Sequence, residues 1–359
     1  MLRSFTLKNF RCFQNLTIEP LERVNLIAGK NNVGKTSLLE AIFIYVNPKT
    51  PEPSLKVNRI RSIAEIDRIQ DEDVEAIKRL FFAQNIDKTI EMSGINENND
   101  KSLLKLNLVD PIGFVIPILD EGDATSIVNQ TLQTEVRPYD NLVLSYSYET
   151  GQERGSSFGW FTNGRLIKPS RLKKFPLVIY LTTSTRSPTE EAKRFSNLER
   201  VGRQNEVLEP LRLLEPRLQR LTLLIVEREP IIYGDIGMSE LVPLPLMGEG
   251  IGRLLSIILA IANAKGGTIL IDEIENGLHY SVLTDVWKAI ADAARRADVQ
   301  IFATTHSLEC IRAAHEAFES SEKYDFRYHR LERIKDEIRA VTYDQENLAI
   351  SDEMNLEMR

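Results

Sequence analysis

The sequence predicts an α/β protein whose core is a mainly parallel β-sheet. A short apolar run at residues 24–28 is followed by a glycine-rich loop and then by an apolar helical pattern at 36–46. Further along the chain, apolar runs at 268–271 and 299–304 flank a helical pattern at 281–296. This strand–helix–strand order predicts a right-handed crossover between two parallel strands.

The composition is that of an ordinary globular chain. Among the 359 residues, 42% are hydrophobic and 27% are charged. No apolar stretch reaches the ~18–20 residues of a transmembrane helix, so we expect no membrane partner. The N-terminus lacks an apolar signal segment and two cysteines cannot form a disulfide framework, so we expect a cytoplasmic protein. The net charge of −7 argues against electrostatic binding of nucleic acid by the surface as a whole, although it allows a local basic patch.

A long insertion follows the first predicted helix. Pro48 and two further prolines end that helix, because proline cannot continue it and restricts the residue before it. Residues 54–88 then have a charged helical pattern, and 89–176 have short β segments with an Asn-Gly hairpin signal at 163–164. We interpret residues 50–175 as an insertion between two parts of one core.

The second half of the chain returns to the core. Residues 177–181 predict a buried strand, and Ser187, followed by proline and glutamate, predicts the start of a helix. Short strands are expected within 221–242, and the nearly all-apolar run at 254–261 predicts a buried helix. After the last core strand we expect two short strands within 326–343 and an acidic tail.

The glycine-rich loop at residues 29–36 fits the pattern G-x-x-x-x-G-K-[ST] at every fixed position. Glycine lets the backbone wrap a polyphosphate closely, so that its N–H groups form an anion-binding nest. Lys35 then reaches the β- and γ-phosphates, the Thr36 hydroxyl binds Mg²⁺, and the helix begun here turns its positive end to the phosphates. The predicted nucleotide-binding residues of this loop are Gly29, Asn31, Asn32, Gly34, Lys35, Thr36 and Ser37.

Two carboxylates end the predicted strand at 268–271. Asp272 at the carboxyl edge of the sheet is expected to hold Mg²⁺ together with Thr36, and Glu273 is expected to polarise the attacking water. The alternative interpretation is that both are merely the acidic first turn of the next helix. Lys35 and Asp272 lie 237 residues apart, which predicts a large insertion between the two motifs.

A histidine ends the next predicted strand. His306 follows the apolar run at 299–304 and should lie beside Asp272 at the same sheet edge. We expect it to contact the γ-phosphate or the attacking water. The alternative is an ordinary surface or packing histidine.

Three segments resemble the SMC-like ATPases. Residues 9–13 (NFRCF) are similar to the start of those proteins, 270–279 (LIDEIENGLH) to their Walker B motif and D-loop, and 304–307 (TTHS) to their switch histidine. As a set they resemble the ATPase domain of the OLD (overcoming lysogenization defect) family, within the ABC-type class. The resemblance implies ATP hydrolysis with ATP and Mg²⁺ as cofactors.

The resemblance also implies a fold and a domain division. The expected fold is an ABC-type P-loop ATPase head with a mainly parallel core sheet, an antiparallel β lobe and an inserted α+β region. The expected ATPase core is residues 1–49 with 176–359, and the expected inserted region is 50–175.

ABC-type ATPases close a signature segment of one protomer on the nucleotide of another, and 247–255 (MGEGIGRLL) matches that segment. Gly248, Glu249 and Gly250 are therefore predicted to bind the partner's nucleotide, with backbone N–H groups at a helix N-terminus. The usual signature serine is absent, and Gly248 stands at its position. An ordinary glycine-rich helix entry is the alternative interpretation.

The resemblance implies a homodimer promoted by ATP that regulates a separate effector in phage defence or DNA repair. OLD proteins carry a TOPRIM nuclease domain, but only 53 residues follow His306, so a separately encoded TOPRIM-type nuclease is the expected partner. DNA stays a candidate partner, because basic residues cluster at 168–174 and 194–203. The alternative interpretation is that these residues form an ordinary charged surface exposed to solvent. The competing functions are a nucleotide-dependent DNA- or protein-binding module with negligible turnover and, less well matched, a transporter ATPase.

Overall fold

The computed structural model describes residues 1–48, 53–54, 56–57, 77–109, 143–150, 153–162, 165–167, 177–183 and 187–353. The chain divides into two compact units. The first unit contains Met1–Ser4, Thr17–Leu39 and Pro176–Arg359, and the second contains Phe5–Leu16 and Glu40–Phe175. The predicted domain division, 1–49 with 176–359 against 50–175, stays a prediction. Within the described part of the chain, no helix is both long and apolar enough to cross a membrane.

A six-stranded sheet forms the centre of the first unit. Its strands, in spatial order, are β16 (Glu337–Tyr343), β15 (Phe326–Ile334), β3 (Val24–Gly29), β14 (Gln300–Thr304), β13 (Thr268–Ile271) and β9 (Val178–Leu181). All neighbours pair in parallel except β15 and β16, which form an antiparallel pair at one edge. Every residue of β3 and β14 is buried, as expected for parallel strands covered on both faces. The predicted α/β fold with a mainly parallel core is confirmed.

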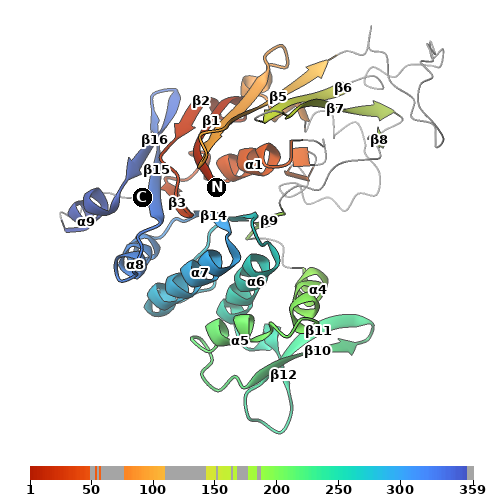
Figure 1. Cartoon of the computed structure of the whole chain (residues 1–359), viewed down its shortest axis with the longest axis vertical. Coiled ribbons are helices and arrows are strands. Elements are labelled where there is room, and N and C mark those ends of the chain that lie inside the picture. Colours follow the sequence, from red (N-terminus) through yellow and green to blue (C-terminus); the bar gives the residue numbers. More distant parts are fainter. Residues whose placement is uncertain are drawn as a thin grey trace. The chain divides into compact units, whose positions relative to one another are not determined.

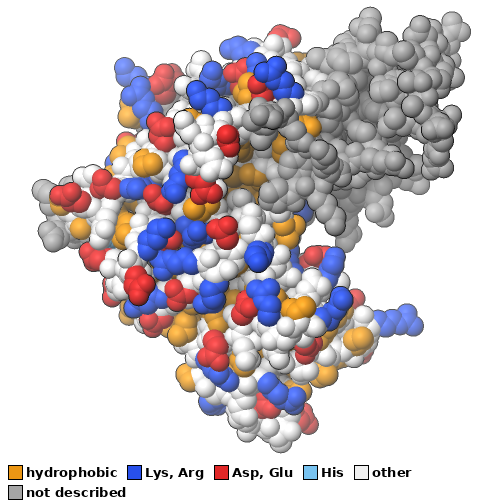
Figure 2. All heavy atoms as spheres, in the orientation of Figure 1, with side chains coloured by type: hydrophobic (Ala, Val, Ile, Leu, Met, Phe, Trp, Pro, Cys, Tyr) orange, Lys and Arg blue, Asp and Glu red, His pale blue; other side chains and the backbone are white. Residues whose placement is uncertain are grey.

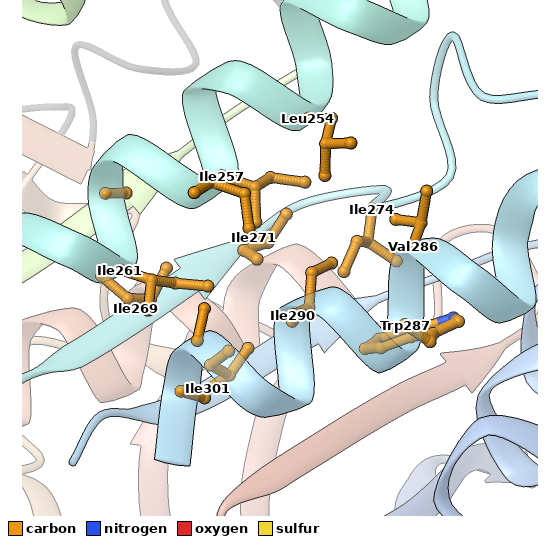
Figure 3. Packing of buried hydrophobic residues seen from close by; sticks show 14 of the residues in the cluster. Leu254, Ile257, Ile261, Ile269, Ile271, Ile274, Val286, Trp287, Ile290 and Ile301 are labelled. Carbon is orange, nitrogen blue, oxygen red and sulfur yellow. The ribbon is translucent and has the colours of Figure 1, made fainter. Parts of the chain in front are cut away.

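Three helices pack beside this sheet: α6 (Glu249–Asn263), α7 (Leu283–Ala297) and α8 (Leu308–Glu319) (Figure 1). Figure 3 shows how Ile257 of α6 and Ile290 of α7 meet Ile271 and Ile301 of the strands beneath them. Every residue of α6 from 251 to 262 is buried, so the predicted all-apolar helix lies within the core. The helix predicted at 281–296 begins slightly later, after the short 3₁₀ turn η3 (Tyr280–Val282).

A small layer of helices and strands packs on α6. It consists of α4 (Pro188–Glu199), α5 (Asn205–Leu211), η2 (Leu244–Leu246) and an antiparallel sheet of β10 (Arg220–Val226), β11 (Glu229–Asp235) and β12 (Val242–Pro243). Ser187 caps α4 as predicted, because its hydroxyl accepts a hydrogen bond from the Glu190 backbone N–H. The strands expected within 221–242 are thereby confirmed.

The second unit is dominated by antiparallel strands. β4 (Ile90–Asn96), β5 (Lys101–Val109), β6 (Val143–Thr150), β7 (Glu153–Thr162) and β8 (Arg165–Ile167) pair in sequence order. They continue a seven-stranded sheet that also contains β1 (Leu2–Phe10) and β2 (Phe13–Ile18). The helix α1 (Lys35–Tyr45) begins in the first unit and ends in the second, and the 3₁₀ turn η1 (Phe82–Gln84) lies in the second. The Asn-Gly pair at 163–164 and most of 54–88 lie outside the described residues.

Two helices were missed near the C-terminal end, where we expected only two short strands and an acidic tail. α8 begins directly after Ser307, whose hydroxyl accepts a hydrogen bond from the Cys310 N–H. α9 (Gln345–Glu353) follows β16. Ser307 followed by a glutamate in the first turn was a usable helix-start signal, whereas the acidic composition of 345–353 concealed the second helix.

Candidate nucleotide site

The loop at residues 29–36 joins β3 to α1 and has a backbone that requires glycine. Gly29 has φ of 141°, and a Cβ atom there would lie 2.5 Å from the Leu331 carbonyl oxygen. Gly34 has φ of 99° and Asn32 has φ of 61°, so the loop repeatedly takes positive φ. Asn31 and Asn32 are exposed, while Ser37 is buried in the first turn of α1.

Lys35 lies inside this loop. Its side-chain Nζ donates to the Gly29 carbonyl oxygen at 2.6 Å and to the Lys30 carbonyl oxygen at 3.0 Å, and the residue is only 5% exposed. Burial lowers the pKa of Lys35, while the charges of Asp272, Glu273 and Glu275 oppose that shift. The loop carbonyl groups thus hold the ammonium group, which interacts with the carboxylates of the acidic strand end, the segment at 272–275 that follows β13.

The acidic strand end lies against the loop. The Thr36 hydroxyl donates to the Asp272 carboxylate, with Oγ1 3.1 Å from Oδ2 and 3.3 Å from Oδ1. A hydroxyl and a carboxylate are oxygen donors of the kind that Mg²⁺ prefers, and Mg²⁺ in phosphate sites needs only one or two protein ligands. The sequence-predicted pair Thr36 and Asp272 therefore meets, and its chemistry fits a magnesium ion.

Glu273 and His306 also meet at this edge. The His306 Nε2 atom lies 3.6 Å from Glu273 Oε1, and both side chains are partly exposed. Glu273 has φ of 47°, a left-handed conformation that turns the chain sharply after β13. The His306 backbone N–H donates to Glu275 Oε1 at 2.9 Å, which ties the histidine turn to the acidic segment.

The signature segment begins α6. Gly248 is the N-cap residue with φ of 114°, and both Gly248 and Glu249 are exposed. A Cβ atom on Gly250 would lie 2.7 Å from the Gly277 carbonyl oxygen. Among the described residues of one chain, this segment packs against residues 277–278, and no contact with the loop at 29–36 is seen.

Three residues that the sequence interpretation missed hold the site together. Thr304 Oγ1 donates to Asp272 Oδ1, and Glu275 Oε1 accepts from the His306 backbone N–H. Arg253 of α6 is buried and donates from Nη2 to the Asp272 and Glu273 carbonyl oxygens at 2.6 and 3.0 Å. A charged residue directly before the nearly all-apolar run at 254–261 was the signal available for Arg253.

The phosphate loop, the buried Lys35 and the Thr36–Asp272 contact at the carboxyl edge of a parallel sheet define a P-loop nucleotide-binding protein. More narrowly, the chain belongs to the family described as "AAA domain, putative AbiEii toxin, Type IV TA system", whose profile matches residues 130–312. A second profile, described as "AAA ATPase domain", matches residues 1–135. The predicted ATPase is confirmed by these two profiles, and its narrower assignment to the OLD family stays a prediction.

Several relatives share parts or most of the chain. An "ATP/GTP phosphatase" of Helicobacter pylori is 26% identical over 335 residues, which cover 87% of this chain and 86% of that protein. The "DNA replication and repair protein RecF" of Pseudoalteromonas translucida is 49% identical over 49 residues, or 14% of each chain. The RecF protein of Bacillus cereus strain G9842 is 30% identical over 150 residues, covering 41% of this chain and 39% of that protein.

Solved SMC heads resemble the chain at a low level. A head bound to the C-winged helix domain of ScpA aligns with a TM-score of 0.49 at 12% identity over 99% of each chain. The SMC head domain from Thermotoga maritima aligns with a TM-score of 0.43 at 14% identity over 96% of this chain and 99% of that chain.

Proposed function

We propose that this AAA-family ATPase binds ATP with Mg²⁺ in the loop at residues 29–36 and hydrolyses it in an ABC-type cycle. The observation that carries the proposal is the contact between Thr36 Oγ1 and the Asp272 carboxylate, because it joins the two motifs that a P-loop site needs. Lys35 supplies the positive charge beside them.

The roles of the side chains follow from their positions. The N–H groups of the loop and the Lys35 ammonium bind the phosphates, and Thr36 and Asp272 hold the metal. Magnesium, when bound, neutralises charge that develops on the phosphates. Glu273 orients the attacking water and accepts its proton, and His306, 3.6 Å from Glu273, hydrogen-bonds the same water or the γ-phosphate.

We propose that ATP promotes a two-fold homodimer. In such an isologous interface, the loop of each protomer faces Gly248, Glu249 and Gly250 of its partner. The exposure of Gly248 and Glu249 supports this arrangement, because the N-terminus of α6 is open to an anion from outside the chain. Light scattering tests it directly: the mass should double from the apo to the ATP-bound protein, and an unchanged monomer at saturating ATP contradicts it.

We propose that closure of this dimer regulates a separate effector, a TOPRIM-type nuclease acting in phage defence or DNA repair. The support is the sequence resemblance, a family description that names a type IV toxin–antitoxin system, and relatives named as replication and repair proteins. Co-purification with the product of the neighbouring gene tests the partner. An isolated chain that cuts DNA with Mg²⁺, Mn²⁺ and ATP contradicts the proposal.

The charges of the described residues give little support to direct DNA binding by this chain. On the face in Figure 2, basic and acidic side chains of the described residues are interspersed. Of the basic residues expected to contact DNA, those at 168–174 lie outside the described residues, and Arg203 of the second group pairs with Glu206. Three basic residues nearby also pair with acidic neighbours: Lys193 with Glu190, Arg212 with Glu209 and Arg217 with Glu215. Paired charges attract phosphate less strongly than a field of one sign.

One observation favours a second candidate, a binding module with negligible turnover. Gly248 stands where the ABC signature carries a serine, so the hydroxyl contact to a partner's γ-phosphate is lost. Steady-state ATP hydrolysis with and without DNA separates the two functions. Turnover favours the ATPase cycle, whereas tight ATP binding with no turnover in either condition favours the module.

A further inference from the structure

Thr304 occupies a central place at the carboxyl edge of the core sheet. It is the last residue of β14, which lies between β3, the strand before the phosphate loop, and β13, the strand before Asp272. The residue is fully buried, at 0% exposure. A polar side chain at that depth needs partners of its own.

The Thr304 hydroxyl makes two hydrogen bonds, each to a different part of the candidate catalytic segment. Oγ1 donates its single proton to Asp272 Oδ1 at 2.6 Å and accepts the Glu273 backbone N–H at 2.8 Å. One hydroxyl therefore uses both its donor and an acceptor position. The bond to the carboxylate is short, as expected for a charged acceptor.

The backbone adds to this attachment. The Ile274 N–H donates to the Thr304 carbonyl oxygen at 3.0 Å, so residues 272–274 are bound to Thr304 at three points. Glu273 between these points has φ of 47°. A non-glycine residue in that conformation is strained and persists where its surroundings fix it.

We propose that Thr304 is a positioning residue that sets both carboxylates of the site, orienting Asp272 for the metal and Glu273 for the attacking water. This inference rests on the proposed ATP- and Mg²⁺-binding function. Its basis is that one buried hydroxyl bonds the Asp272 side chain and the Glu273 backbone together.

The geometry indicates how Asp272 is oriented. Thr304 occupies Oδ1 at 2.6 Å, and the contact that Thr36 makes with Oδ2, at 3.1 Å, is shorter than its contact with Oδ1, at 3.3 Å. The hydroxyl of Thr304 thus holds Oδ1 and leaves Oδ2 turned to the side chain that shares the metal. Without that hydroxyl, rotation about the Cβ–Cγ bond of Asp272 is less restricted and the Glu273 N–H loses its acceptor.

The test uses the full chain with Thr304→Val, which keeps the shape and removes the hydroxyl, and Thr304→Ser, which keeps the hydroxyl. Binding of a fluorescent ATP analogue without divalent ions measures the phosphate loop alone. Mn²⁺ affinity, measured by electron paramagnetic resonance with a non-hydrolysable ATP analogue bound, measures the metal position. Thr305→Val is the matched control, because the neighbouring buried Thr305 hydroxyl accepts from the Ser307 N–H and not from Glu273.

We expect Thr304→Val to bind the analogue normally without metal but to bind Mn²⁺ roughly 10- to 100-fold more weakly, as for loss of a hydrogen bond to a charged group. Thr304→Ser should restore most of the affinity, and Thr305→Val should keep the wild-type value. A role in folding alone would lower the melting temperature without this pattern. If Thr304→Val does not fold, Thr304→Ala gives the same comparison with Thr304→Ser.

Two results overturn the inference in distinguishable ways. Wild-type Mn²⁺ affinity and wild-type ATP turnover in folded Thr304→Val refute the role of Thr304 and leave the proposed function standing. A wild-type protein that binds neither the ATP analogue nor Mn²⁺ refutes the proposed function itself, and the inference falls with it.

Discussion

Low pH should destabilise the first unit through one buried histidine, His329 of β15. The residue is fully buried, and its Nδ1 atom lies 3.0 Å from Thr342 Oγ1 of the paired strand β16. Burial, and secondarily the charge of Arg327, lowers the pKa of His329 from 6.5 to about 3. The folded chain therefore keeps this imidazole neutral at pH values where the unfolded chain protonates it.

The sign and size of the effect follow from that difference. Because the pKa is lower in the folded state, the unfolded state binds more protons between pH 6.5 and pH 3, and stability falls as the pH falls through this window. The slope approaches ~1.4 kcal/mol per pH unit. Between pH 7.5 and pH 4.5 the loss from this residue is about 2–3 kcal/mol, a large fraction of a typical stability.

Urea denaturation at both pH values, followed by tryptophan fluorescence, measures this loss, since Trp287 is buried in the hydrophobic cluster of the core and reports its unfolding. Carboxylates also titrate, so the comparison is with His329→Gln and His329→Phe, neither of which binds a proton here. Wild type should lose about 2–3 kcal/mol more than either variant over this range. Equal losses in all three proteins would refute the argument, whatever the absolute stabilities.

Three further changes test the site. Lys35→Ala should weaken ATP binding by about 2–5 kcal/mol, because the phosphates lose a buried counter-charge; a titration with fluorescent ATP that gives wild-type affinity contradicts this. Glu275→Ala should slow turnover roughly tenfold, because the His306 N–H loses its carboxylate acceptor. A tenfold change corresponds to the loss of about one hydrogen bond to a charged group. Glu275→Gln, which keeps the acceptor, should recover most of that rate, and equal rates in both variants contradict the role. Gly250→Val should lower the free energy of unfolding by about 1–3 kcal/mol, because the new Cβ would lie 2.7 Å from the Gly277 carbonyl oxygen. An unshifted melting curve contradicts this prediction.

Much of the core fold was predictable because its signals are local. Continuous apolar runs at 268–271 and 299–304, with an amphipathic helix between them, became β13, β14 and α7 within two residues of the expected limits. Their parallel pairing followed from the crossover rule. α9 was not predicted, because residues 345–353 have no clear apolar periodicity.

The candidate site was predictable where its residues belong to one contiguous motif. The loop at 29–36 and the strand end at 272–273 each have a local pattern, and the structure brings Thr36 to Asp272. Thr304, Glu275 and Arg253 have no such pattern, since their importance lies in hydrogen bonds between segments that are distant in sequence. Only the folded chain reveals these contacts, because strand order decides which segments become neighbours.

Steady-state ATP hydrolysis by Glu273→Gln is the most direct test of the central claim. The amide cannot accept a proton, so the variant should bind Mg²⁺ and ATP as wild type does and turn over at least ~100-fold more slowly. Because its nucleotide persists, the same sample should also have the doubled mass of the ATP-bound dimer in light scattering. Turnover at the wild-type rate, with ATP binding intact, would contradict the account.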